Sequence, residues 1–449
     1  MKTRTISIKI LLLLMIFMAT PVQAENRALM TLLKALQENG TIDMQTYELV
    51  KKVAEAESMS EQQAVEEITR KEIEKPAEQV IKAKVEPVQM PKVSSEHKLR
   101  IGGRLQIDAA VYKEDIASHN DGTEIRRARL YALGDLGKGW DYMLQYDFTA
   151  SGINGIRDAW LAYRGLDLFD IRIGHFKEPF SNRVSSKHYL FLERGLPDVV
   201  FDIGRNLGIG LTRSGKNWSI AGGVFGEGPD GASDDNDEGF GASSRVTYAP
   251  LFEKTHVWYM GASAAYRSTG SDDLLRLRAR PDSHVTDTHL VDTGDIDVDS
   301  YNRFNGEMGY VYGPFHLEGE YYYASLERDS AANADLDFSG FFVQGGWFLT
   351  GESMNFNPVI STFGRLSPNN AVGDGGIGAW QVALRFSSLD LTDEDIIGGE
   401  QENLTVGLNW YPTANIRFMA NYVNVLDVSG GPHDGDTPEV FQLRSQVEF

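Results

Sequence analysis

Apolar and polar residues alternate with a period of two along most of the chain from Lys98 to Phe449. Between residues 140 and 148 every second residue is aromatic or leucine, and mostly polar residues stand between them. The same period recurs at residues 315–323, 380–386, 404–410, 416–422 and 441–449. Successive side chains of a strand point to opposite faces of its sheet, so each segment has an apolar face and a polar face. The alternation therefore predicts an all-β region.

Alternation alone does not separate a soluble sandwich from a membrane barrel, but the lengths of the connections do. Every second connection is short, as at Gly137-Lys138 and Tyr312-Gly313-Pro314, and the others are mostly longer and rich in Asp, Gly and Ser. Bacterial barrels have an even strand number, short periplasmic turns and long outer loops, so we predict a transmembrane antiparallel β-barrel of about 16 strands. We expect strands at residues 98–112, 123–136, 139–150, 155–165, 168–177, 206–214, 216–226, 240–249, 255–268, 298–312, 314–327, 337–350, 376–389, 400–411, 415–427 and 438–449.

One connection, at residues 351–375, breaks this rule because it is long on the side of the short turns. A long turn at that side is otherwise unexplained. We therefore predict that it folds back into the pore.

The residues before the barrel divide into three segments. Residues 1–24 have a basic start, an apolar run and small residues before the end, which is typical of a cleaved signal peptide and too short for a spanning helix. Residues 25–75 carry leucines at three- and four-residue spacing and predict a short periplasmic helical module, with a coiled coil as the alternative. Residues 76–97 contain three prolines and predict an extended linker.

The composition excludes several classes of protein. There is no cysteine, which rules out disulfides, thiol catalysis and thiolate metal sites. A mean hydropathy of −0.30 is too low for a helical membrane protein, and a net charge of −21 argues against a nucleic-acid partner. We find no nucleophile elbow, phosphate loop or zinc-protease motif, and the histidines lack metal spacing. We therefore expect a protein that is not an enzyme and has no cofactor and no metal site.

Short motifs spread over nearly the whole predicted barrel carry a family resemblance. They are Gly103-Arg104-Leu105-Gln106, Arg126-Arg127-Ala128-Arg129-Leu130, Asp158-Ala159-Trp160, Gly174-His175-Phe176-Lys177-Glu178-Pro179-Phe180, Ser185-Ser186-Lys187, Phe191-Leu192-Glu193-Arg194, Gly378-Ala379-Trp380, Gly407-Leu408-Asn409-Trp410-Tyr411-Pro412 and Arg444-Ser445-Gln446-Val447-Glu448-Phe449. With these motifs the chain resembles the phosphate-selective porin O and P family. The resemblance implies a trimeric porin of the Gram-negative outer membrane that passes small anions, phosphate or polyphosphate above all. It also implies that the third outer loop, residues 177–205, folds inward and narrows the pore.

An anion in a narrow pore needs fixed donors that replace its water, and Arg and Lys with hydroxyl groups are suited to that task. Strand parity places Arg100, Arg104, Arg127 and Arg129 on the inner face, opposite apolar neighbours. The resemblance implies a binding site in the constriction, made of Arg104, Arg126, Arg127, Asp158, Ser185 and Ser186, with Arg183 or Lys187 as a further base.

A second basic feature is a row of three arginines, Arg276, Arg278 and Arg280. In an extended chain, residues spaced by two project to one side, roughly 6–7 Å apart. The row resembles the arginine ladder that the fifth outer loop of this family contributes to the pore wall. The alternative is local pairing with nearby acids, which are Asp282, Asp287, Asp292 and Asp295.

The acidic total is compatible with anion transport if the acids lie away from the constriction, because the local field decides selectivity. Many of them fall at residues 230–238 and 390–400, which we assign to outer loops facing lipopolysaccharide and outer-membrane lipid. Two alternatives stay open: a general or sugar-permeable porin, for which Tyr131 and Tyr163 are candidate inner aromatics, and a structural protein that tethers the envelope.

Overall fold

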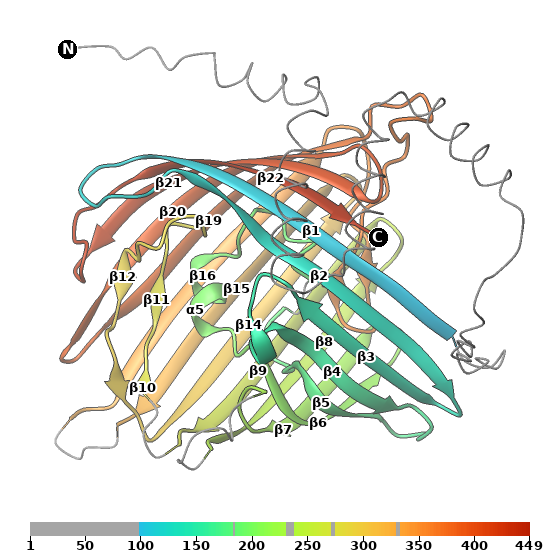
Figure 1. Cartoon of the computed structure of the whole chain (residues 1–449), viewed down its shortest axis with the longest axis horizontal. Helices are drawn as coiled ribbons and strands as arrows, with labels where there is room; N and C mark the ends of the chain where they lie inside the picture. Colours follow the sequence, from blue (N-terminus) through green and yellow to red (C-terminus); the bar gives the residue numbers. More distant parts are fainter. Residues whose placement is uncertain (1–97, 183–184, 230–237, 271–273, 329–332) are drawn as a thin grey trace, which may run out of the picture. The chain divides into compact units, whose positions relative to one another are not determined.

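The computed structural model describes residues 98–182, 185–229, 238–270, 274–328 and 333–449. Within them, sixteen antiparallel strands form a closed barrel in which β22 returns to pair with β1 (Figure 1). The barrel strands are β1 (Lys98–Lys113), β2 (Gly122–Gly137), β3 (Trp140–Asp147), β4 (Ile156–Tyr163), β5 (Asp170–Lys177), β6 (Arg205–Ser214), β7 (Trp218–Phe225), β8 (Phe240–Phe252), β9 (His256–Ser268), β14 (Ser300–Tyr312), β15 (Phe315–Glu327), β16 (Leu336–Phe348), β19 (Ala379–Asp393), β20 (Ile396–Tyr411), β21 (Ile416–Ser429) and β22 (Glu439–Glu448).

The sequence-based prediction of a sixteen-stranded barrel is confirmed. The predictions for the signal peptide, the helical module and the linker lie outside the described residues. No helix in the described part of the chain is long and apolar enough to cross a membrane.

The two faces of the barrel wall follow the alternation in the sequence. On β14, Phe304 and Met308 are exposed on the outer face, whereas Asn305 and Glu307 are buried on the inner face. Closure leaves no unpaired strand edge, so the backbone groups are satisfied within the wall, as a lipid environment requires. Outside, Trp380, Trp410 and Phe418 stack with 5.4 Å between the centroids of neighbouring rings. This matches the aromatic belts of membrane interfaces.

One wall of the barrel is much lower than the other. The strands β3, β4, β5 and β7 have 8 residues each, whereas β19 has 15 and β20 has 16. A tilted strand needs about 9–11 residues to cross a bilayer.

The connection at residues 178–204, here called the constriction loop, enters the lumen. Its short helix α5 (Leu196–Phe201) contacts β15, β16 and β19. Buried side chains of the loop, Phe180, Leu196 and Phe201, join a hydrophobic cluster with Tyr322 and Phe342 of the opposite wall. The predicted inward fold of the third outer loop is therefore confirmed, and one side of the lumen is a packed core rather than a wet wall.

The connection at residues 269–299, here called L5, also packs inside. It forms two small ladders, β10 (Leu274–Leu275) with β13 (Ile296–Asp297) and β11 (Arg278–Ala279) with β12 (Val291–Asp292). Leu277 and Ala279, which alternate with Arg276, Arg278 and Arg280 in the sequence, are buried in the same hydrophobic cluster. The only other short helix described is η1 (Gly152–Gly155), in the connection between β3 and β4.

The long connection at residues 351–375 contains a small hairpin inside the barrel, with strands β17 (Phe356–Asn357) and β18 (Thr362–Phe363). Arg245, on the inner face of β8, donates to the carbonyl oxygens of Ile360 and Ser361 at 2.9 Å each. Phe363 is only 2% exposed. The prediction that this connection folds into the pore is confirmed for the hairpin, whereas residues 369–375 are largely exposed and Val372 donates to Pro412 O in a short turn.

The outer connection predicted at residues 390–399 is present but much shorter than predicted. The strands β19 and β20 continue through it and meet at a two-residue turn, where Glu394 has φ 51°. Asp390 and Glu400 pair across the two strands, while Leu389 and Leu391 point inward and are buried. The sequence suggested a loop because it is acidic, but those acids lie on the outer face, and the alternate residues pack against L5.

Candidate functional site

A cavity of about 920 Å³ lies between the constriction loop, L5 and the wall formed by β1 to β6. Its basic lining residues are Arg104, Arg126, Arg127, Arg129, Arg157, Lys177, Arg194, Arg205, Arg278 and Arg280. Its acidic lining residues are Asp158, Glu193, Asp202 and Asp282. Among the described residues, therefore, ten Arg and Lys face four Asp and Glu at this cavity, although the whole chain has a net charge of −21.

A bulge in β2 brings two neighbouring arginines to the cavity. The pairing of β1 with β2 moves from Gln106↔Arg127 to Ile107↔Ile125, so Arg126 has no partner on β1. The extra residue of a bulge lets the chain re-aim a side chain. Arg126 and Arg127 both line the cavity as a result, whereas strand parity predicted only Arg127 inside.

A second bulge occurs in β4. Its pairing with β3 moves from Gln145↔Asp158 to Tyr146↔Ile156, which leaves Arg157 as the extra residue. Arg157 and Asp158 both line the cavity. Sequence reasoning selected Asp158 and missed Arg157, because a period-two pattern assigns neighbouring residues to opposite faces.

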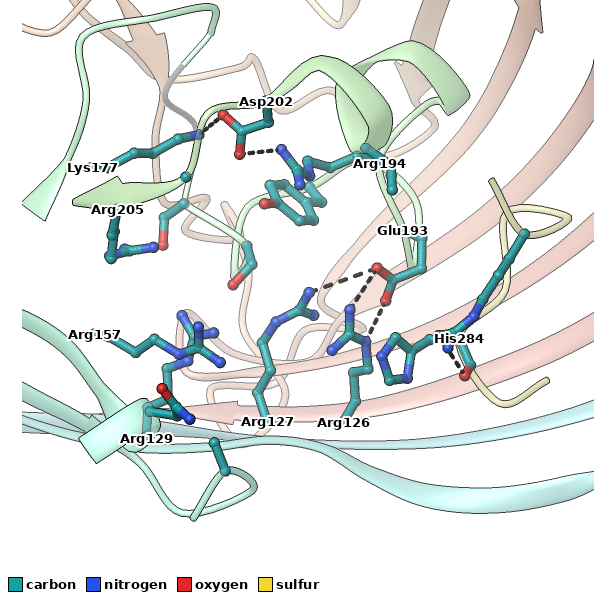
Figure 2. A pocket seen from close by; sticks show the side chains of 18 of the residues that line it. Arg126, Arg127, Arg129, Arg157, Lys177, Glu193, Arg194, Asp202, Arg205 and His284 are labelled. Atoms are coloured by element: carbon teal, nitrogen blue, oxygen red, sulfur yellow. Dashed lines mark hydrogen bonds and ion pairs between the residues drawn. The ribbon is translucent and has the colours of Figure 1, made fainter. Parts of the chain in front are cut away.

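The guanidinium groups of the first pair converge on a carboxylate of the constriction loop (Figure 2). Arg126 donates to Glu193 from Nε at 2.8 Å and from Nη2 at 3.0 Å. Arg127 Nη2 lies 3.7 Å from Glu193 Oε2, and its Nη1 donates to Gln106 Oε1 at 3.0 Å. Burial raises the pKa of Glu193, but Arg126 and Arg127 outweigh it and hold that pKa well below its ordinary value. Glu193 is therefore ionised.

The predicted serine pair also lies at the cavity. Arg104 Nη1 donates to the hydroxyl of Ser185 at 3.1 Å, and Gln106 Nε2 donates to the backbone oxygen of Ser186 at 3.1 Å. The hydroxyl of Ser186 and Nε of Arg104 are buried and have no hydrogen-bond partner among the described residues. Such groups are costly to leave unsatisfied, which favours a bound ligand or water beside them.

Some of the remaining charged groups of the cavity pair with one another, whereas Arg129 and Arg157 pair with Asp147, which does not line the cavity. Asp158 accepts from Arg205 at 3.1 Å, and Asp202 lies 3.5 Å from Lys177 Nζ and 2.6 Å from Arg194 Nη1 (Figure 2). Burial raises the pKa of Asp202, but Lys177 and Arg194 lower it by a larger amount, so the net direction is downward.

Three of the predicted residues are placed elsewhere or lie outside the described residues. Lys187 turns away from the cavity and pairs with Glu448 at 3.0 Å, which the spacing of the serine motif could not reveal. Arg276 does not line the cavity but binds Asp292 at 2.7 Å. Arg183 is not among the described residues.

The three arginines of the predicted arginine ladder therefore do not act as one row. Arg278 and Arg280 line the cavity, and Arg280 also pairs with Asp287 at 2.8 Å. The alternative of local pairing thus holds for Arg276, which binds Asp292, and for Arg280, which binds Asp287. The pairing of strand β11 with strand β12 brings these two acids close to the arginines.

One candidate for a sugar track is placed on the wrong face. Tyr163 packs against Trp140 with 4.7 Å between ring centroids, and Trp140 is exposed on the outer face. Leu161, two residues earlier, is also exposed there. Of the two aromatics proposed for the lumen, only Tyr131 fits, and Arg100 lies over its ring at 5.9 Å.

Inward side chains of β19, β21 and β22 hold the constriction loop by its carbonyl oxygens. Arg417 donates to Tyr189 O at 2.7 Å, Arg444 to Leu192 O at 2.6 Å and Arg385 to Glu193 O at 2.9 Å. Sequence reasoning missed the role of these arginines. Alternation gave their inward direction, but nothing local shows which loop they meet.

The comparisons with known proteins agree with this architecture. Residues 99–449 match the family model described as "Phosphate-selective porin O and P". An uncharacterized protein of Caulobacter vibrioides is 28% identical over 354 residues, which cover 75% of this chain and 70% of that protein. Porin O of Pseudomonas aeruginosa is 25% identical over 401 residues, which cover 79% of this chain and 89% of that protein.

Solved porins share the fold at low sequence identity. The anion-selective porin of Comamonas acidovorans superposes with a TM-score of 0.53 at 13% identity, over 79% of this chain and 100% of that one. OmpT of Vibrio cholerae gives 0.50 at 11% identity, over 79% and 98%. Because the family model matches the whole described barrel, the chain belongs to the phosphate-selective porin O and P family and is a porin of the Gram-negative outer membrane.

Proposed function

We propose that this porin is a passive, anion-selective channel that prefers phosphate or polyphosphate. The observation that carries the proposal is the cavity in which ten Arg and Lys stand against four Asp and Glu, inside an otherwise acidic chain. A narrow site with low-dielectric walls concentrates the field of its nearest charges, so these residues outweigh the distant acids.

The arrangement suggests two steps. Arg278 and Arg280 gather anions at the side of the cavity formed by L5. Arg104, Arg126, Arg127 and Ser186 then bind phosphate oxygens, since guanidinium and hydroxyl donors together replace water of hydration. Asp158 accepts the hydrogen of a protonated phosphate and tempers the positive field, so that the ion can leave.

Single-channel recording in potassium chloride with added phosphate tests the proposal. Phosphate bound at the cavity should reduce the chloride current in a saturable way, because an occupied site excludes chloride. A cation-selective channel, or a chloride current that phosphate leaves unchanged, would favour the general-porin alternative.

Replacing Arg278 by Ala should lower the conductance at low salt by about twofold to threefold, the effect of one charge roughly 7 Å from the path in a water-filled mouth. The sign of the selectivity should not change, because the other basic groups of the cavity remain. Arg276→Ala is the matched control, since Arg276 lies in the same row but does not line the cavity. Equal losses in both variants would contradict a specific capture role for Arg278.

We further propose that the porin is a homotrimer whose interface uses the low wall. Strands of 8 residues are shorter than the roughly 9–11 that cross a bilayer alone, so this wall is better suited to a protein neighbour than to lipid. Residues 1–24 are proposed as a cleaved signal peptide, 25–75 as a periplasmic helical module and 76–97 as a linker. We assign the protein no enzymatic activity.

A further inference from the structure

Glu193 occupies the arginine cluster that the proposed function assigns to the permeating anion. Its carboxylate receives two hydrogen bonds from Arg126 and one from Arg444 Nη2, at 3.0 Å. Arg127 lies slightly farther away. Figure 2 shows Arg126 and Arg127 beside Glu193 at the wall of the cavity. With Arg444, which does not line the cavity, three guanidinium groups surround one carboxylate.

The three arginines differ in how many hydrogen bonds they donate to this carboxylate. Arg444 is shared with Asp108, which it contacts with two nitrogens at 2.7 and 2.6 Å. Arg126 directs Nε and Nη2 at Glu193. The 3.7 Å between Arg127 Nη2 and Glu193 exceeds an ordinary hydrogen bond, so Arg127 Nη2 can bind a ligand without breaking a hydrogen bond to Glu193, while Nη1 keeps its bond to Gln106.

The backbone around Glu193 is fixed, but its side chain borders open space. Arg385 holds the carbonyl oxygen of Glu193, and Arg444 holds that of Leu192. The carboxylate itself faces the cavity of about 920 Å³. A change of side-chain rotamer is therefore enough to move the carboxylate off Arg126, with no movement of the loop.

We propose that Glu193 is a resident carboxylate that sets the affinity of the channel: an entering anion displaces it from Arg126 and Arg127, and its return releases the anion. This inference rests on the proposed function. A multiply charged anion surrounded by unopposed arginines would bind too tightly to pass quickly, and conduction requires binding weak enough to leave. Glu193 supplies a competing ligand of the same chemistry at the same donors.

Glu178 shows what a purely structural carboxylate of the same loop looks like. It is buried, accepts from Asn206 at 2.6 Å and from Arg267 at 2.5 Å, and does not line the cavity. Glu178 thus fixes the loop to the wall without facing the path. It is the matched control for Glu193.

The test compares Glu193→Gln with Glu178→Gln in single-channel recordings with chloride as carrier and inorganic phosphate as blocker. For Glu193→Gln, the half-blocking phosphate concentration should fall about tenfold, the effect of losing one charged competitor for a hydrogen bond. The current carried by phosphate alone should fall as well, because release becomes slower. Glu178→Gln should keep the wild-type half-blocking concentration. A folded Glu193→Gln channel with unchanged or weaker phosphate block overturns the proposal.

If Glu193→Gln does not insert into the membrane as a channel, a second pair of variants tests the proposal. Arg126→Gln leaves Glu193 beside Arg127 and should weaken phosphate block about tenfold. The double variant Arg126→Gln/Glu193→Gln removes both charges and should return the block to within about threefold of wild type. A double variant that blocks no better than Arg126→Gln overturns the proposal, because a structural role predicts added damage.

Failure of this inference is distinguishable from failure of the proposed function. If Arg127→Glu abolishes anion selectivity while the Glu193 variants leave phosphate block unchanged, the cavity is the anion site and Glu193 is not its competitor. If the wild-type channel shows no phosphate block at all, the proposed phosphate preference fails, and with it the inference.

Discussion

Replacing Arg127 by Glu is expected to abolish phosphate block and to shift the channel from anions toward cations. Arg127 is buried at the cavity and keeps donor capacity beyond its bond to Gln106. An anion about 6 Å away loses roughly 3 kcal/mol of attraction and meets a repulsion of similar size, at an effective dielectric constant of about 20. The new carboxylate also lies beside Glu193, which adds to the local negative charge.

The reversal potential in a potassium chloride gradient measures this shift, and added phosphate measures the block. Arg276→Glu makes the same change of charge in L5, outside the cavity, and should leave the sign of selectivity unchanged. If Arg127→Glu keeps wild-type selectivity and phosphate block, the assigned site is wrong and the general-porin alternative replaces it.

The second large effect is expected from Asp282→Asn, which should release L5 from the lumen. Asp282 accepts from Arg385 at 2.8 Å and from Thr405 at 3.2 Å, and the side chains of Asp282 and Arg385 are almost fully buried. Removing the charge leaves Arg385 uncompensated, which costs about 3 kcal/mol or more for such a pair. Asp282 has φ 49°, a conformation that Asn also tolerates, so the variant isolates the lost charge from backbone strain.

Trypsin added to intact cells measures the release. Arg278 lies in the ladder of β11 with β12, and Arg276 lies between β10 and β11. Both arginines should be cleaved slowly in wild type but rapidly in Asp282→Asn. The low-salt conductance should fall below that of Arg278→Ala, since Arg280 leaves the cavity too. Asp287→Asn is the control, because its side chain is exposed and pairs with Arg280 at the surface. Equal protection of L5 in wild type and Asp282→Asn would show that the ion pair does not anchor the loop.

The alternation of the sequence determined the barrel, its sixteen strands and the inward direction of residues such as Arg104 and Arg127. These features depend on the pleat of an extended backbone, which is a local property that each strand carries by itself. The long turn at residues 351–375 was also predictable, because a long connection on the side of the short turns needs a place inside. The family motifs added Arg126, Asp158 and the two serines, which parity alone did not select.

The tertiary structure decided everything that depends on register or on partners far apart in the chain. The bulges at Arg126 and Arg157 arise from the pairing with a neighbouring strand, and a period-two pattern contains no sign of them. Glu193 meets Arg444 across 251 residues of sequence, and Lys187 meets Glu448 instead of the cavity. Such contacts form when loops enter a closed barrel. The sequence pattern therefore gives the inward direction of residues on regular strands, but only the packed fold decides which further charges enter the lumen and which charges neutralise one another.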